Sequence, residues 1–496
     1  MAGTKAPAGP DEGAPNKRMV LAVVSASVFM ATLDGSIVNI ALPTIAAQFR
    51  IDATQVESVV TAYLLAIAST LLLVGALADR IGRKRLFAAG IAVFTLGSGL
   101  CAAATALEPL VAFRVVQALG GSLMFAIGAA ILTAAYPARE RGAALGAIGT
   151  AVAGGQTAGP VIGGLLLQLF GWQAIFLVNL PIGAAALLLA RRELADDHPG
   201  ARPRGEVRPR GAFDVPGAVL LPSALFLLIV AFEIAALEAG ATPLVFALLA
   251  LVAVLLVAFR QVERRAAVPI VNLGALRNRE FALSNAAGLL SFIAIGASFF
   301  LLPFYMEGVL GYPPYKMGLM LLPIPAAIAV ISPYSGRLSD RIGTRVPCVA
   351  GMAMAAAAAL SLTTLGPSST EVDLAWRFAL FGASMAIFQS PNNSTIMGSV
   401  ERRFLGLASG MMATMRTLGF AVGVAGGAGL LAVGYLGASG VPLPPAHEAV
   451  DVAAFVSAQS LAFFAVAAIC IAGAVATAVR PSAPPHGGAP VGAPGP

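Results

Sequence analysis

The chain consists largely of apolar segments, about fourteen in number and roughly twenty residues long, joined by polar connections. A segment of that length can cross the hydrocarbon core of a bilayer as one helix. Hydrophobic residues make up 58% of the sequence and charged residues only 11%, too few charges for the surface of an ordinary water-soluble domain. The apolar residues run continuously and do not alternate with polar ones, which excludes a transmembrane barrel. We therefore predict an all-α polytopic membrane protein.

The predicted spans form two groups of six, with a polar linker and two further spans between them. In chain order the spans are 19–41, 56–78, 86–106, 108–132, 143–166, 172–190, 214–236, 242–260, 281–304, 316–338, 347–366, 373–397, 404–432 and 455–479. The expected parts are a tail at 1–18, a six-helix bundle at 19–190, a linker at 191–213, two additional helices at 214–260, a loop at 261–280, a second six-helix bundle at 281–479 and a tail at 480–496.

A charged motif occurs twice. Residues 75–84 read GALADRIGRK, and 261 residues later residues 336–345 read GRLSDRIGTR (336 − 75 = 261). Each copy joins two apolar spans, as expected for a transporter built from two related halves. The copies lie eight spans apart and not six. The two spans within 214–260 therefore look like an insertion between pseudo-symmetric halves.

Basic residues gather in alternate connections. If the N-terminus is cytoplasmic, the outer side holds only two basic residues, Arg50 and Lys316, the latter at the edge of its span. This positive-inside pattern predicts a multi-pass protein of the cell (inner) membrane with both termini cytoplasmic. The net charge of +7 then reflects topology and anionic lipid, so we expect the lipid bilayer as a partner and no nucleic acid. We expect a monomer.

The sequence contains no phosphate-binding loop, no metal-ligand spacing and no nucleophile constellation. We therefore expect no cofactor, no metal and no ATP hydrolysis, and a secondary active transporter rather than an enzyme. All three histidines lie outside the spans, so a carboxylate is the expected proton carrier.

Polar side chains within the apolar spans are the candidate coupling and cavity residues. Asp34 lies in the first span, where a carboxylate is costly. It is either neutralised by a neighbouring arginine or helix end, or it binds a proton or cation. Arg114 and Gln117 share one face of the fourth span, and Arg114 either holds helices together or takes part in coupling. Asn39 and Gln156, with Asp34 and Gln117, are the candidates for lining a substrate cavity.

The fifth span carries a stripe of small residues. Gly155, Gly159 and Gly163 recur at a spacing of four, with Pro160 and Gly164 beside them. The stripe is typical either of ordinary glycine packing or of an unusually close helix contact, where Pro160 loosens the backbone.

The duplicated loops carry candidate gating residues. Asp79 lies beside Arg80 and Arg83 in the first copy, and Asp340 beside Arg341 in the second. Positive-inside topology does not require an acid there. These residues are either a gate contact formed in one state and broken in another, or a solvated charge cluster. Other charged residues in or near the spans have no assignable role: Glu233, Glu307, Arg377 and Arg416.

Together these motifs resemble those of the major facilitator superfamily, specifically its fourteen-helix drug:proton antiporters. The segments that carry the resemblance are 33–43, 75–86, 114–121, 155–164, 171–181 and 416–419. Ala118 departs from the glycine that the family usually has. The tenth span, 316–338, lacks the acid of some relatives that export divalent cations, which favours a monovalent cationic, neutral or zwitterionic substrate.

The resemblance implies two six-helix bundles around a central cavity that opens alternately to either side. It also implies proton-coupled export of amphipathic small molecules such as drugs or antibiotics. A proton on Asp34 would weaken its hold on a cationic substrate, and Arg114 would tune its proton affinity. The alternatives are an exporter of one endogenous metabolite, lipid or peptide, and, from a different class, a membrane sensor or a channel.

Overall fold

The computed structural model describes residues 16–136, 140–194, 242–265, 278–400, 405–445 and 450–480, with scattered positions between 216 and 234. The first helices are α1 (Lys17–Phe49), α2 (Ala53–Val56), α3 (Ser58–Ile81), α4 (Arg83–Ala102), α5 (Leu107–Ala135), α6 (Arg141–Phe170), α7 (Ala174–Leu177) and α8 (Asn179–Glu193). The others are α10 (Pro243–Arg265), α11 (Arg279–Gly308), α12 (Pro314–Leu321), α13 (Pro323–Ile342), α14 (Arg345–Leu362), α15 (Glu371–Gly398), α16 (Leu405–Ser439) and α17 (Val452–Ala478).

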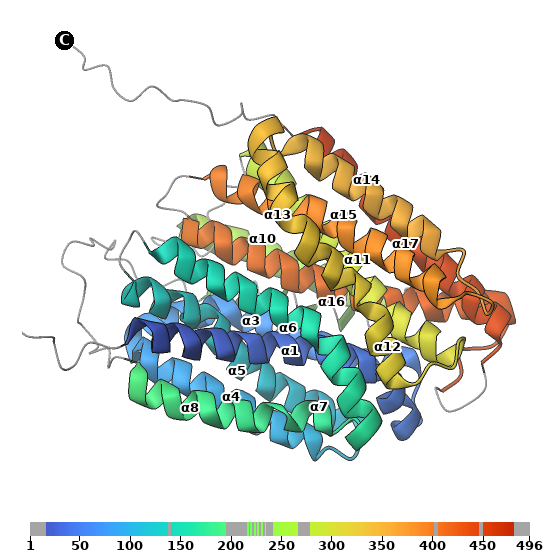
Figure 1. The fold of residues 1–496 in the computed structure, drawn as a ribbon, viewed down its shortest axis with the longest axis horizontal. Coiled ribbons are helices and arrows are strands. Elements are labelled where there is room, and N and C mark those ends of the chain that lie inside the picture. Colours follow the sequence, from blue (N-terminus) through green and yellow to red (C-terminus); the bar gives the residue numbers. More distant parts are fainter. Residues whose placement is uncertain are drawn as a thin grey trace, which may run out of the picture.

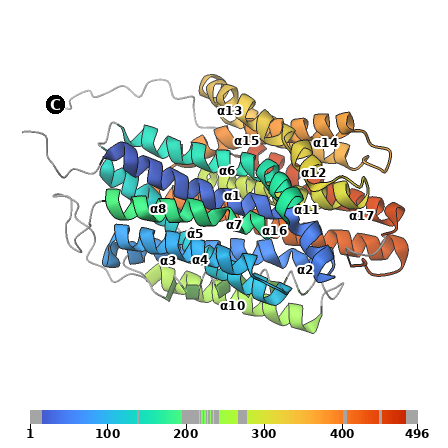
Figure 2. The same ribbon diagram turned by 60° about the horizontal axis from the view of Figure 1, so that its bottom comes forward.

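The helices run in a common direction and form two bundles that lie against each other (Figure 1). We call α1–α8 the N-half and α11–α17 the C-half. Figure 2 shows α10 at the edge of the molecule, outside both bundles. In the described part of the chain, eleven helical segments are long and apolar enough to cross a membrane. The all-α polytopic fold is thus confirmed. The count of fourteen stays a prediction, because most of the span at 214–236 lies outside the described residues.

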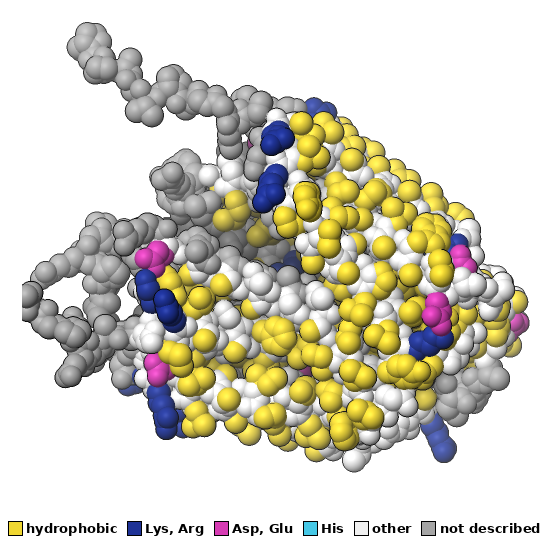
Figure 3. All heavy atoms as spheres, in the orientation of Figure 1, with side chains coloured by type: hydrophobic (Ala, Val, Ile, Leu, Met, Phe, Trp, Pro, Cys, Tyr) yellow, Lys and Arg dark blue, Asp and Glu magenta, His cyan; other side chains and the backbone are white. Residues whose placement is uncertain are grey.

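The surface suits a bilayer. Apolar side chains cover the middle of the face in Figure 3, and the charged side chains lie mainly toward its two ends. On α10 the exposed fractions of Phe246 and Val254 are 61% and 62%. Such a continuous apolar surface is stable only against hydrocarbon or another protein.

Polar caps define several helix starts. The side chains of Asn16, Asn278 and Asp451 accept hydrogen bonds from backbone N–H groups of the first turns of α1, α11 and α17. At α15, Thr370 and Asp373 cap each other's backbone N–H groups. These caps satisfy donors that no helix can satisfy internally.

Two differences between the helices and the predicted spans involve prolines. The span at 316–338 is divided into α12 and α13, and Pro323 begins the second piece. The first helix, α1, ends at Phe49, whereas the predicted span ends at residue 41. Pro43 lies inside this helix; it lacks a backbone N–H and so removes one hydrogen bond, but the helix continues past it.

The two halves contact each other tightly toward one end. A Cβ atom added at Gly318 of α12 would overlap the carbonyl oxygen of Pro160 on α6, and one added at Gly164 would lie 2.5 Å from the carbonyl oxygen of Pro314. Further along, Leu65 of α3 packs in one cluster with residues of α16. Glycines thus permit a backbone-to-backbone contact between the halves.

The opposite end, where α1 begins, is called the basic end here because it carries Arg83, Lys84, Arg85, Arg191, Arg192 and Arg345. In both views α6 lies beside α12 but diverges from α13 toward the basic end (Figures 1 and 2). The halves are thus joined at α6 and α12, away from the basic end, and α6 and α13 diverge toward it.

Candidate functional site

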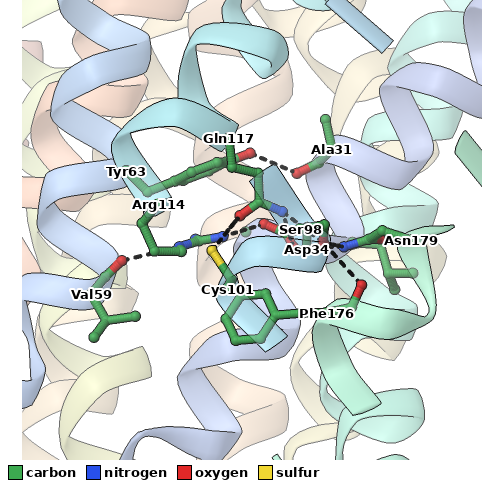
Figure 4. A network of polar contacts seen from close by, with 12 residues as sticks. Ala31, Asp34, Val59, Tyr63, Ser98, Cys101, Arg114, Gln117, Phe176 and Asn179 are labelled. Atoms are coloured by element: carbon green, nitrogen blue, oxygen red, sulfur yellow. Dashed lines mark hydrogen bonds and ion pairs between the residues drawn. The ribbon is translucent and has the colours of Figure 1, made fainter. Parts of the chain in front are cut away.

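An ion pair lies in the interior of the N-half (Figure 4). Nη1 of Arg114 on α5 is 2.5 Å from Oδ2 of Asp34 on α1, and both side chains are completely buried. A buried pair of this kind is stable only where further hydrogen bonds satisfy the remaining polar atoms.

Amide groups supply those bonds to Asp34. Its Oδ1 accepts hydrogen bonds from Nε2 of Gln117 and from Nδ2 of Asn179, both at 2.8 Å. The carboxylate therefore binds side chains of α5 and α8 at once. Its negative charge holds three helices of the N-half in one arrangement.

Ser98 of α4 connects the amides to the backbone. Its Oγ accepts hydrogen bonds from Gln117 at 3.0 Å and Asn179 at 2.9 Å, and donates one to the carbonyl oxygen of Phe176 at 2.9 Å. The hydroxyl thereby satisfies two donors and one acceptor that would otherwise be buried without partners.

The guanidinium of Arg114 has several partners besides Asp34. Its Nε donates to the carbonyl oxygen of Val59 at 3.2 Å, and its Nη1 donates to Oε1 of Gln117 at 2.6 Å. It also lies over the ring of Tyr63, 3.9 Å from the centroid. Its Nη2 has no hydrogen-bond partner among the described residues. The network thus leaves one donor of the guanidinium unused.

The structure brings together only some of the predicted coupling and cavity residues. Asp34, Arg114 and Gln117 form the network, and all three are buried. Asn39 is 2% exposed, and its Nδ2 donates to the carbonyl oxygen of Gly35 on its own helix. Gln156 on α6 is exposed. In this conformation Asp34 cannot touch a substrate in a cavity.

The glycine stripe lies where α6 crosses α1. A Cβ at Gly155 would be 2.8 Å from the carbonyl oxygen of Phe29, and one at Gly163 would be 2.6 Å from Cγ1 of Ile37. A Cβ at Gly159 would overlap Ser36. The other edge of α6, at Pro160 and Gly164, forms the contact with α12 described above. The close-approach interpretation of the stripe fits this geometry on both sides of the helix.

The predicted gating residues are only partly placed. Nη1 of Arg83 lies 3.5 Å from the carbonyl oxygen of Ala130 on α5, and Arg341 is exposed. The side chains of Asp79, Arg80 and Asp340 lie outside the described part of the structure.

The residues of unassigned role fall in different places. Nη1 of Arg377 binds Oδ1 of Asp373 at 3.1 Å, one turn away on α15. Oε2 of Glu307 near the end of α11 is buried with no hydrogen-bond partner among the described residues. Arg416 lies partly buried on α16, and Glu233 lies outside the described residues. No cluster of three or more potential metal ligands occurs in the described ranges.

Sequence reasoning missed four side chains of the network: Tyr63, Ser98, Asn179 and Cys101, whose Sγ donates to Oε1 of Gln117 at 3.7 Å. Asn179 offered a signal, because it is an amide in the middle of an apolar stretch, two residues before a proline. Ser98 offered none, since serine is common in membrane helices and usually bonds to its own backbone.

Comparisons with known proteins agree with this fold. A sequence profile of the Major Facilitator Superfamily matches residues 24–424. The riboflavin transporter RibZ of Clostridioides difficile (strain 630) is 35% identical over 409 residues, which cover 82% of this chain and 87% of RibZ. The multidrug resistance protein Stp of Mycobacterium tuberculosis (strain CDC 1551 / Oshkosh) is 34% identical over 419 residues, 83% of this chain and 75% of Stp.

A solved structure shares the architecture. The POT family transporter PepTSo matches with a TM-score of 0.69 over 94% of this chain and 98% of that chain. At 14% sequence identity this likeness concerns the fold alone. The chain belongs to the Major Facilitator Superfamily and is a multi-pass membrane transporter of small molecules rather than an enzyme.

Proposed function

We propose that this transporter is a proton-coupled antiporter that exports amphipathic small molecules by alternating access. The supporting observation is the buried Asp34–Arg114 pair, whose carboxylate is held by donors from two other helices. A carboxylate buried within membrane helices is costly, and proton relays are one of the functions for which such residues are retained.

Protonation of Asp34 would change how α1 is held. The neutral acid no longer attracts Arg114, so the contacts that tie α1 to α5 and α8 weaken together. Next to Asp34 on α1, Ser36 donates a hydrogen bond to the carbonyl oxygen of Gly155 on α6 at 3.1 Å. A shift of α1 would thus reach α6, and through the glycine contact it would reach α12 in the C-half.

This route makes coupling indirect. Asp34 is fully buried and satisfied in this conformation. The family resemblance implied that the proton and a cationic substrate compete for the Asp34 carboxylate, but in this conformation the carboxylate is not open to a substrate. We propose instead that proton and substrate each favour one arrangement of the halves.

Orientation and organisation are part of the proposal. We place the basic end and both termini in the cytoplasm of a cell (inner) membrane, in accordance with the positive-inside pattern. We keep the predicted division into bundles at 19–190 and 281–479, with 214–260 as an additional pair, and a monomeric protein. The peripheral place of α10 in Figure 2 supports that division. We also keep Asp79, Asp340 and their basic neighbours as a cytoplasmic gate.

The substrate class follows from apolar helices and from the relatives. One relative is named a multidrug resistance protein, which favours polyspecific export. Another is named a riboflavin transporter, and this favours the second candidate, a dedicated exporter of one metabolite. A polyspecific exporter should be inhibited by many unrelated amphipathic compounds, whereas a dedicated exporter should be inhibited only by close analogues.

Transport in everted membrane vesicles tests the proposal. An imposed pH gradient, acidic inside, should drive accumulation of tetraphenylphosphonium or riboflavin, and an ionophore that collapses the gradient should abolish it. Uptake should saturate, which a channel would not show, and a sensor would show no uptake. Accumulation that ignores the pH gradient would refute proton coupling.

A further inference from the structure

The carboxylate of Asp34 has only hydrogen-bond donors as partners among the described residues. Its Oδ2 accepts from Nη1 of Arg114, and its Oδ1 accepts from the side-chain amides of Gln117 and Asn179 (Figure 4). This environment suits the ionised carboxylate. A proton on Asp34 changes the balance, because the acid then carries an O–H that must donate, and the groups around it are donors too.

The two oxygens of the carboxylate differ as places for that proton. The positive guanidinium of Arg114 lies against Oδ2, so the negative charge is retained there, whereas the partners of Oδ1 are neutral amides. Tyr63 on α3 and Cys101 on α4 also interact electrostatically with the carboxylate. The ionisable residues of α8, 191–193, lie at the far end of that helix. The proton is therefore expected on Oδ1, beside the amides.

Only one of the two amides is free to become an acceptor for this proton. Oε1 of Gln117 accepts from Nη1 of Arg114 at 2.6 Å, so turning this amide would bring two donors together. Nδ2 of Asn179 donates to Asp34 and to Ser98, while its Oδ1 is buried with no hydrogen-bond partner among the described residues. A half-turn about the Cβ–Cγ bond exchanges the places of Nδ2 and Oδ1. The Oδ1 of Asn179 would then face the protonated acid as an acceptor.

Ser98 can follow that half-turn. Its Oγ lies 2.9 Å from Nδ2 of Asn179, and its hydroxyl donates to the carbonyl oxygen of Phe176 at 2.9 Å. After the half-turn an acceptor faces Ser98, and its hydroxyl can rotate to donate to that acceptor instead. The hydrogen bond between α4 and α7 would be given up. Protonation would thus change a contact between helices to which Asp34 does not belong.

The backbone around Asn179 places this amide in the interior of the N-half. The short helix α7 ends at Leu177, and α8 begins at Asn179. Pro181 has no N–H to donate to the carbonyl oxygen of Leu177, which interrupts the helix hydrogen bonds at this point. Asn179 is completely buried at the break, where the contact between α4 and α7 is also made.

We propose that Asn179 is a positioning residue that responds to the proton on Asp34. Its amide donates to the ionised carboxylate and, after a half-turn, accepts a hydrogen bond from the protonated acid. The proton binds Oδ1 of Asp34, and apart from that O–H only hydrogen bonds form or break. The inference deepens the proposed function and rests on it, because it requires Asp34 to bind a proton.

Infrared difference spectroscopy of the purified full-length protein tests this inference. Spectra are compared between alkaline and acidic pH, with asparagine isotope-labelled at its side-chain carbonyl. Protonation of Asp34 replaces the carboxylate bands by the C=O band of a carboxylic acid, a change that should be missing in Asp34→Asn. In the wild type an asparagine carbonyl band should shift over the same pH range, because an oxygen without a partner becomes an acceptor.

Replacement of Asn179 by leucine keeps the bulk of the side chain but removes the amide. The asparagine shift should then vanish. The proton should also bind Asp34 about tenfold more tightly, so that the acid band appears about one pH unit higher. The reason is that the ionised form loses a charge-assisted hydrogen bond, whereas the protonated form loses a neutral one that is about half as strong.

A matched control removes a different buried asparagine. Asn392 on α15 is 2% exposed, its Nδ2 donates to the carbonyl oxygen of Ser284 at 3.1 Å, and its Oδ1 lacks a partner among the described residues. Because it lies in the C-half, Asn392→Leu should leave both the asparagine shift and the proton affinity unchanged. If Asn179→Leu fails to fold, Asn179→Ala replaces it, and the labelled wild type tests the half-turn without any substitution.

The outcomes separate this inference from the proposed antiport. An acid band of Asp34 without any asparagine shift, or a shift that survives in Asn179→Leu, would overturn the half-turn and leave proton binding intact. An unchanged proton affinity in Asn179→Leu would show that the amide does not act on Asp34. A wild type that shows no acid band of Asp34 at any pH would overturn both proposals.

Discussion

Replacement of Asp34 by asparagine should separate the stabilising role of the buried pair from its role in coupling. In the structure, Arg114, Gln117 and Asn179 all donate to the carboxylate. An asparagine keeps one acceptor oxygen but presents an amide nitrogen to the remaining donors, and it removes the charge that balances Arg114. The variant therefore leaves a buried guanidinium without a counter-charge.

The energetic consequence is large for a single residue. Removing one partner of a buried ion pair costs about 3–5 kcal/mol, compared with a typical total stability of about 5–15 kcal/mol. Removing both charges at once is nearly neutral in many proteins. We therefore expect Asp34→Asn to unfold at a clearly lower temperature, and the double variant Asp34→Asn/Arg114→Gln to recover most of the loss.

Transport should not recover with stability. One pH unit supplies about 1.4 kcal/mol per proton, which is a tenfold concentration ratio. In everted vesicles with that gradient, one-for-one exchange should let the wild type accumulate tetraphenylphosphonium about tenfold. Both the single and the double variant should approach a ratio of one, because neither carries the proton-binding carboxylate. Purified protein gives the unfolding temperature, and the same preparation in vesicles gives the ratio.

Two results would refute this reasoning. If the stable double variant still accumulates tetraphenylphosphonium about tenfold, Asp34 is not the coupling carboxylate. If Asp34→Asn unfolds at the wild-type temperature, the pair is not the stabilising contact that its geometry indicates.

Three further predictions concern the network and the glycine contacts. Arg114→Lys should accumulate more tetraphenylphosphonium under an imposed pH gradient than Arg114→Ala, since lysine keeps the positive charge although it loses the fork of donors. Equal accumulation in the two variants would show that the charge at this position is irrelevant. Gly159→Ala should slow substrate exchange, measured as counterflow, because its Cβ overlaps Ser36, and an unchanged rate would contradict close approach of α6 to α1. Gly318→Leu should push α12 away from Pro160 and favour an arrangement that is open at the end opposite the basic end. A cysteine placed between the halves at that end should then be labelled faster than in the wild type, and an unchanged labelling rate would contradict the prediction.

The membrane fold could be predicted because hydropathy acts locally. Each span had to be apolar over the thickness of the bilayer, so helices such as α11 and α17 lie within a few residues of the predicted ranges. An ion pair between Asp34 and an arginine was one of the two interpretations of Asp34 that the sequence offered, again because of the local cost of a charge in a membrane span. Each is a costly charge in a span, and each requires a partner.

The rest of the network depends on contacts that are distant in the chain. Asn179 meets Asp34 across 145 residues, and nothing in the local sequence of either residue specifies the other. Arg480 is a second residue whose environment depends on contacts that are distant in the chain. Its charge and position suggested a tail residue, but it is 2% exposed, and its Nη1 donates to Ser284 at 3.0 Å. A guanidinium can be satisfied by hydroxyl groups, which a rule based on charge does not anticipate.

The two halves share a fold but carry different chemistry, and this difference bears on how coupling works. The N-half buries an acid and a base, Asp34 and Arg114, whereas in the C-half Asn285 and Asn392 are buried neutral amides. If the proton binds at Asp34, inside the N-half, a substrate that binds outside that network does not block the proton site. The free energy that links them must then lie in the arrangement of the halves. The contact of Gly318 with α6 is present in this arrangement, so any arrangement that separates α12 from α6 must give up its energy when proton or substrate binds.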